Sequence, residues 1–172
     1  KLENAQFDEG NTSLSTFENI SSWVSYAILS LISTKDFRPD SNWIARRLGV
    51  SVHEVRDSVD SLIKTGLLEV GKNDIWRQGK QKIRINNRVS TATSRRFQKE
   101  LIQKSLESLE NDPIEIRDHS SITFALSVED LPKIKAELRK MRLRLTERFE
   151  TPNRANEVYN LTVQLTPLTR TK

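Results

Sequence analysis

Apolar residues recur at helical spacing in three successive segments of the first half of the chain. These segments cover about residues 23–32, 43–48 and 52–63. A turn at Gly49 joins the last two segments, and Ser51 followed by Glu54 is the signature of a capping box at the start of the third. We therefore expect three helices, of which the second and third form a helix-turn-helix.

A short apolar strand is expected directly after these helices. Gly66 ends the third helical pattern, and Leu67, Leu68 and Val70 follow it. In a winged helix-turn-helix, a strand at this place leads into the hairpin that is called the wing. We assign residues 17–90 to such a domain and the polar residues 1–16 to a linker or disordered tail.

The second half of the chain carries a different pattern. A helix is expected over about residues 93–110, and residues 122–126 and 159–165 then alternate apolar with polar or small side chains, as a strand with one apolar face does. A helix with an apolar stripe from Leu131 to Leu145 lies between them. Phe124 and Tyr159 are expected in the core rather than in a ligand site.

Two strands alone make a poor sheet, so further strands must come from this chain or from a second copy of it. We assign residues 91–172 to a helix plus a β-α-β module that serves for dimerisation or sensing. The predicted fold class is α+β: a winged helix-turn-helix followed by a helix and a strand-helix-strand module.

Composition bounds the remaining possibilities. The 172 residues suffice for one large or two small domains. The chain has no cysteine, which excludes disulfides and cysteine-ligated metal or redox sites. No apolar run approaches the roughly 20 residues that span a bilayer, so we expect no membrane contact and a cytoplasmic location.

Positive charge is concentrated where the wing is expected. Residues 72–99 hold nine Lys and Arg against one acid, Asp74, a local net charge of +8, whereas the whole chain has a net charge of +5. A concentrated basic patch beside a helix-turn-helix is the electrostatic footprint of a phosphate-backbone contact. Solubility, or docking on an acidic protein, is the alternative explanation.

The third helix argues against simple base reading. Its expected outward positions include Glu54, Asp57 and Asp60, as well as Ser58, and their net charge with the neighbouring basic residues is −1. Carboxylates there are repelled by DNA. Asp57 and Asp60 are expected to face Arg46 and Arg47 on the second helix. The helix is therefore either a base reader or a structural or dimerising element.

The basic residues divide into two groups of candidate DNA contacts. The groove-facing candidates are Arg46, Arg47, His53 and Arg56. The candidates for the phosphate backbone are Lys72, Arg77, Lys80, Lys82 and Arg84, with Arg88, Arg95 and Arg96 as a possible extension of the patch.

Little in the sequence points to catalysis. The two histidines, His53 and His119, belong to different expected modules and form no metal site. The five glycines form no phosphate-binding loop. We predict a protein that is not an enzyme and that needs no cofactor or metal.

Long phrases of the sequence resemble a known family. They are Trp23 in the first helix, WIARRLGVSVHEVRDSVDSLIKTGLLE, Trp76, RRFQKELIQKSLESLE, SSITFALSVEDLPKIKAELRKMRLRL and VYNLTVQLTPLT. Over about residues 17–169 the chain is similar to the C-terminal domain of unknown function in a bacterial family of predicted transcriptional regulators. The resemblance implies a repressor-type helix-turn-helix upstream, in agreement with a sequence that starts at Lys1. It supplies no catalytic residues.

Two hypotheses follow. In the first, the chain is a bacterial transcriptional regulator, or its C-terminal regulatory half, which binds double-stranded DNA through the winged helix and its basic wing. In the second, it is a protein-interaction, dimerisation or signal-sensing module whose winged helix does not read DNA. A homodimer is expected in either case, and an effector ligand or protein is an open possibility.

Overall fold

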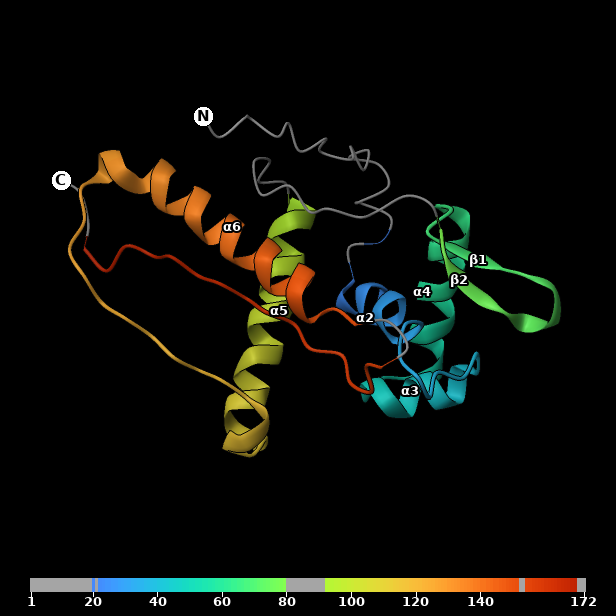
Figure 1. Ribbon diagram of the computed structural model, residues 1–172. Helices are drawn as coiled ribbons and strands as arrows, with labels where there is room; N and C mark the ends of the chain where they lie inside the picture. The colour runs from blue at the N-terminus through green and yellow to red at the C-terminus, as the bar shows by residue number, and fades with distance from the viewer. Residues whose placement is uncertain (1–19, 21, 80–91, 152–153, 170–172) are drawn as a thin grey trace.

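The computed structural model describes residues 20, 22–79, 92–151 and 154–169 (Figure 1). Its helices and strands are α2 Trp23–Leu31, α3 Ser41–Leu48, α4 Val52–Lys64, β1 Leu68–Val70, β2 Trp76–Gln78, α5 Ala92–Asn111 and α6 Leu131–Phe149. Short 3-10 turns lie at Lys72–Asp74, Ile114–Ile116 and Val128–Asp130. Helices together with one small sheet make the chain α+β, as predicted. The predicted tail at residues 1–16 lies outside the described residues.

Polar side chains cap the three helices α2, α3 and α4. The Trp43 amide donates to Asp40 Oδ1 at 2.6 Å at the start of α3. At the start of α4, the Glu54 amide donates to Ser51 Oγ at 3.2 Å, and the Ser51 amide donates back to Glu54 Oε2 at 3.0 Å. The predicted capping box is confirmed. Gly49 ends α3 with φ of +65°, a conformation that favours glycine.

One apolar core holds α2, α3, α4 and the hairpin together. Its most deeply buried members come from every one of these elements: Ile20, Val24, Ile28, Leu31, Ile44, Ala45, Val55, Val59, Leu62, Leu67 and Leu68. Trp23, Trp43 and Val52 are partly buried against it. The helical spacing predicted this set well. Ile63 is the exception, since 44% of it is exposed.

The hairpin β1–β2 is antiparallel, with Leu68 opposite Gln78 and Val70 opposite Trp76. Its base closes tightly, because the Gly79 amide donates to the Leu67 carbonyl at 2.8 Å. A Cβ atom at Gly79 would lie 1.9 Å from the Gly66 carbonyl oxygen. Only a glycine therefore allows the second strand to return to the end of α4.

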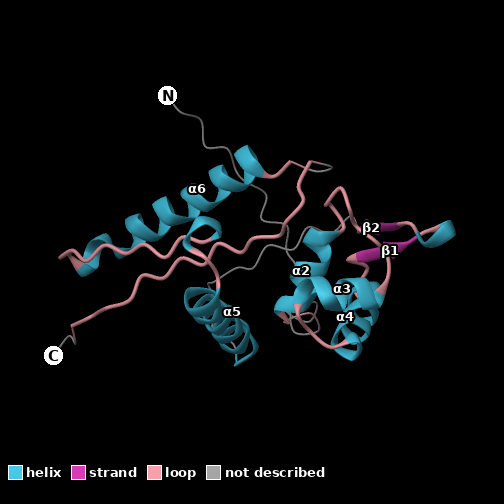
Figure 2. Ribbon diagram, turned by 90° about the horizontal axis from the view of Figure 1, so that it is seen from below, coloured by secondary structure: helices cyan, strands magenta, loops and turns pink. Residues whose placement is uncertain are grey.

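Helix α5 packs on α2, as Figures 1 and 2 show from two directions. The rings of Phe97 and Tyr26 lie 4.9 Å apart, and Lys104 Nζ lies 4.7 Å above the Trp23 ring. The helix expected over about residues 93–110 is confirmed. Of the apolar residues along it only Phe97 is buried, whereas Leu106 and Leu109 are exposed.

The two strands predicted in the second half are not strands here. Residues 118–127 and 155–168 run as extended chain toward the end of the molecule where α6 begins (Figure 1). A strand needs a neighbour to receive its backbone hydrogen bonds. Within the described part of the chain, no such bond joins these segments, and the sheet consists of β1 and β2. The helix between them is confirmed as α6.

We predict that Gly79→Ala destabilises the fold by about 2 kcal/mol or more, since the added Cβ meets rigid backbone. Gly71→Ala is the matched control in the same hairpin. Its Cβ would lie 3.4 Å from the Ile75 carbonyl oxygen, an ordinary contact, so its effect should stay within about 0.5 kcal/mol. Urea unfolding followed by tryptophan fluorescence measures both. Equal stability of the two variants would contradict the proposed closure.

Candidate functional site

The hairpin is fixed to the helices by polar and aromatic contacts. Gln78 Nε2 donates to the Leu29 carbonyl at 2.6 Å and to Ser33 Oγ at 3.2 Å, which ties β2 to the end of α2. The Trp76 ring lies 5.8 Å from that of Phe37, which in turn lies 6.0 Å from Trp43 on α3. The hairpin cations are thus held at a defined place beside the helix pair.

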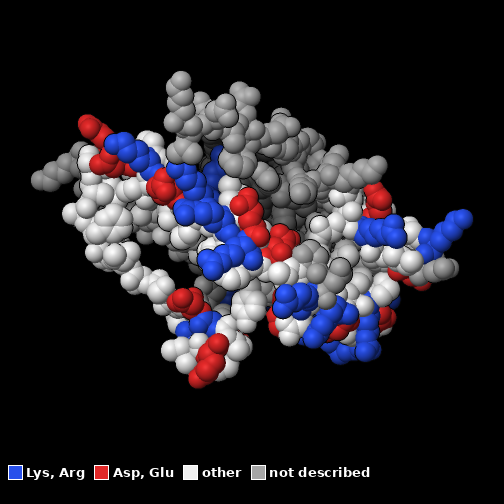
Figure 3. Space-filling model, viewed as in Figure 1, with Lys and Arg blue, Asp and Glu red and all other residues white. Residues whose placement is uncertain are grey.

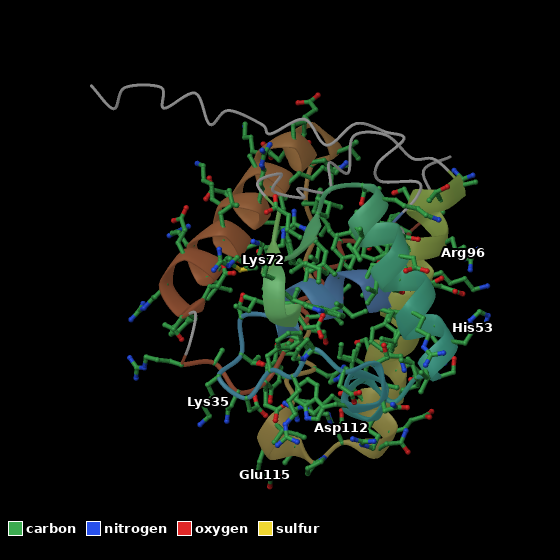
Figure 4. All side chains as sticks on the ribbon, turned by 90° about the vertical axis from the view of Figure 1, so that its right-hand side faces the viewer. Lys35, His53, Lys72, Arg96, Asp112 and Glu115 are labelled. Atoms are coloured by element: carbon green, nitrogen blue, oxygen red, sulfur yellow. The ribbon has the colours of Figure 1, made fainter. Side chains whose placement is uncertain are left out.

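The described hairpin carries two of the predicted basic residues, and both are exposed. Lys72 begins the 3-10 turn at its tip, and Arg77 lies on β2 opposite Glu69. Figure 4 looks onto this side of the molecule and shows Lys72 on the hairpin. Four further predicted wing residues lie outside the described residues: Lys80, Lys82, Arg84 and Arg88.

Helix α4 presents a mixed, slightly acidic outer face. His53, Arg56, Asp57 and Asp60 are exposed, and His53 Nδ1 lies 3.4 Å from Asp57 Oδ1. In Figure 4, His53 lies on the outer flank of α4. Ser58, which was expected to point outward, is buried. The first turn of α4 is therefore open, and an acidic residue sits next to its histidine.

Arg47 is occupied within the chain. Its guanidinium donates to the Asn156 carbonyl at 2.7 Å, lies 3.3 Å from Glu157 Oε1 and lies 5.7 Å from the Trp43 ring centre. The expected pairing of Arg46 and Arg47 with Asp57 and Asp60 is wrong, because no ion pair among the described residues joins these side chains. For Arg47 the reason is that the segment after α6 returns to α3 and supplies nearer acceptors, whereas Asp57 lies beside His53. Arg46 is exposed on α3.

Arg95 and Arg96 lie at the start of α5, away from the hairpin tip. Arg96 Nε donates to Glu100 Oε1 at 3.1 Å, one turn further along the helix. In Figure 4, Arg96 lies on the same flank as His53 rather than beside Lys72. The predicted extension of the hairpin's basic patch by Arg96 is therefore wrong in Figure 4, because Arg96 lies on another flank and pairs with Glu100.

Helix α6 carries a basic face that the sequence analysis missed. Figure 3 shows Lys and Arg over the hairpin, around α3, and along the length of α6. Between Leu131 and Phe149 there are seven Lys and Arg and two Glu, a net charge of +5. A charge count for each expected helix, rather than for the wing alone, would have found this face.

The described residues show no other chemical centre. They contain no group of three or more His, Asp or Glu side chains that could hold a metal ion. Shallow open grooves run along α6, lined in part by Ile134, Leu138 and Met141. That the protein is not an enzyme stays a prediction. Among the helices described, none has the length and apolar character to cross a membrane.

Taken together, these elements form a small α+β protein in which a hairpin is fixed beside a helix pair. The hairpin exposes the cations Lys72 and Arg77 and also the acids Glu69 and Asp74. The chain matches a family described as a domain of unknown function, DUF4423, over residues 4–168, and it belongs to that family. No curated protein and no solved structure matches the chain.

We predict that Ser51→Ala lowers stability by about 1 kcal/mol, because it removes the N-cap of α4. Hydrogen bonds from the Ser51 amide and then from its Oγ hold the pKa of Glu54 below its ordinary value of 4.5, and the variant removes the bond from Oγ. A lowered folded-state pKa stabilises the protein at neutral pH, and this contribution is lost as the pH falls through it.

The difference between the unchanged chain and Ser51→Ala should therefore shrink in acid, below the ordinary Glu pKa. Thermal unfolding at several pH values measures it. Ser30→Ala, at an exposed position within α2, is the control and should leave stability nearly unchanged. A difference that stays constant down to acid pH would contradict the role of the Glu54 carboxylate.

Proposed function

We propose that residues 20–79 form a winged helix-turn-helix and that the protein binds double-stranded DNA as a bacterial transcriptional regulator, or as its regulatory half. The support is the order of the elements: two helices joined at the left-handed Gly49, with a hairpin directly after the second. The observation that carries the proposal is the pair of exposed cations, Lys72 and Arg77, on a hairpin that is tied to both α2 and α3.

The charges on the hairpin and on α4 give these two elements different roles in DNA binding. The hairpin cations contact phosphates, which contributes affinity without sequence preference. The outer face of α4 offers Arg56 and His53 to base edges, but Asp57 and Asp60 oppose close approach to DNA. Most of the affinity is therefore electrostatic, and it falls steeply as salt rises. Arg47 takes no part while Glu157 and Asn156 hold it.

We predict that Lys72→Gln combined with Arg77→Gln weakens binding to random-sequence duplex DNA. Log affinity falls with log salt, and each lost phosphate contact makes the slope shallower by about one. The slope of the double variant should therefore be shallower by about two. Fluorescence anisotropy across a salt series measures this. The affinity of the unchanged chain should be micromolar, roughly 10⁻⁴ to 10⁻⁶ M in Kd at physiological salt.

The matched control is Lys133→Gln combined with Lys140→Gln, which removes the same charge from exposed positions on α6. Figure 1 places α6 at the opposite end of the molecule from the hairpin. The control should keep the slope of the unchanged chain. If the control loses more DNA affinity than the hairpin variant does, the DNA contact lies on α6 instead.

The acidic face of α4 favours a second candidate function, a protein-interaction module. Glu54, Asp57 and Asp60 are all exposed there. Such a face fits a basic partner protein better than a duplex.

Asp57→Lys combined with Asp60→Lys separates the two candidates. If α4 faces DNA, exchanging two repelled carboxylates for two cations should raise non-specific affinity by roughly tenfold or more and steepen the salt slope. In an interaction module, the same change leaves DNA affinity unaltered and weakens the protein partnership. The anisotropy assay distinguishes these results directly.

A further inference from the structure

The two halves of the described chain differ in how far their apolar residues are buried. Of the twelve buried apolar residues, eleven lie in residues 20–79, and the other is Phe97. Of the nineteen large apolar residues that are exposed, sixteen lie in residues 92–169. Monomeric proteins rarely expose contiguous apolar patches larger than roughly a few hundred Å². The second half therefore carries a surface that is built to be covered.

The extended segments 118–127 and 155–168 expose both apolar side chains and backbone. Ile122 is 82% exposed, Phe124 50% and Tyr159 71%. Their alternating pattern is that of strands with one apolar face. Within the described part of the chain, no backbone hydrogen bond joins one segment to the other. Apart from their end residues Ser127 and Ala155, these segments are strand edges without a backbone partner among the described residues.

Helix α6 shows the same incompleteness. Among the described elements, its main contacts are with the 3-10 turn that precedes it. Its apolar stripe includes Met141 and Leu145, which are both exposed, and Ile134 and Leu138 line a shallow groove that the described chain leaves open. An amphipathic helix of this kind needs a sheet or a second helix against its apolar side.

The charge pattern indicates which kind of partner covers this surface. Helix α6 has a net charge of +5, whereas residues 105–118, at the end of α5 and in the turn after it, hold five acids and one arginine, a net charge of −4. Both patches belong to the same exposed half of the chain. Because the two patches have opposite signs, the basic patch of one copy can pair with the acidic patch of a second copy across a two-fold axis.

We propose that the surface is an interface with a second copy of this chain, in which residues 118–127 and 155–168 of both copies pair into one sheet and the two α6 helices cover it. The two segments run in the same direction within one copy (Figure 1), so a two-fold axis supplies antiparallel partners to their free edges. Interfaces of this obligate type bury about 2,000 Å² or more. The inference does not depend on DNA binding.

The first test is the mass in solution, by light scattering and sedimentation in the absence of DNA, from about 1 to 100 µM. The unchanged chain should have a mass of about 40 kDa, twice the 19.9 kDa of one chain. A mass of 19.9 kDa at every concentration would overturn the proposal and assign the surface to another occupant.

Phe124→Asp places a charge in the proposed interface and should shift the mass to that of one chain. Ile75→Asp is the matched control, because Ile75 is equally exposed, at 50%, but lies in the hairpin. It should remain a dimer. All three tryptophans lie in residues 20–79, so their fluorescence shows that each variant keeps its core. A Phe124→Asp chain that stays dimeric would overturn the interface.

Thr123→Pro tests strand pairing separately from apolar contact. Proline removes a backbone donor from the segment and leaves its apolar side chains in place. The variant should raise the dimer Kd by roughly tenfold or more, because each of the two copies loses a backbone hydrogen bond. An unchanged Kd would show that the backbone of this segment pairs with no neighbour, which contradicts the shared sheet.

Discussion

The described structure depends on burying one compact set of apolar side chains where α2, α3 and α4 meet β1. Ile28, Ile44 and Leu62 are fully buried at this junction, and each comes from a different helix. Leu67 and Leu68 continue the core into the hairpin, so the same burial that holds the helices together sets the hairpin's position. The exposed cations are placed by this core rather than by contacts of their own.

The sequence predicted the elements whose signals are local. The capping box at Ser51, the turn at Gly49 and the helical spacing of the core depend on residues within a few positions of one another, so they could be recognised directly. The contacts of Arg47 could not, because its partner Glu157 is 110 residues away. Strand pairing is likewise non-local, and the alternation at Phe124 indicates a strand without naming its neighbour.

The sequence predicted only part of the charge distribution, because charge was counted over one segment. The count over residues 72–99 indicated a concentration of positive charge after α4 and implied that the rest of the chain is slightly acidic. Of the cations on the predicted wing, Lys72 and Arg77 are described. That average conceals α6, whose net charge of +5 is offset elsewhere, in part by residues 105–118. Cations are therefore exposed at opposite ends of the molecule, on α6 and on the hairpin, where Glu69 and Asp74 offset Lys72 and Arg77. The proposed function rests on the hairpin, which the core holds beside α4.

Amide hydrogen exchange with and without duplex DNA tests that assignment most directly, because it reports on the hairpin and on α6 at once. Binding through the winged helix predicts slower exchange in the hairpin, residues 68–78, and in the first turns of α4, with residues 131–149 unchanged. Slower exchange confined to α6, with the hairpin unaffected at a DNA concentration that saturates binding, would contradict the account.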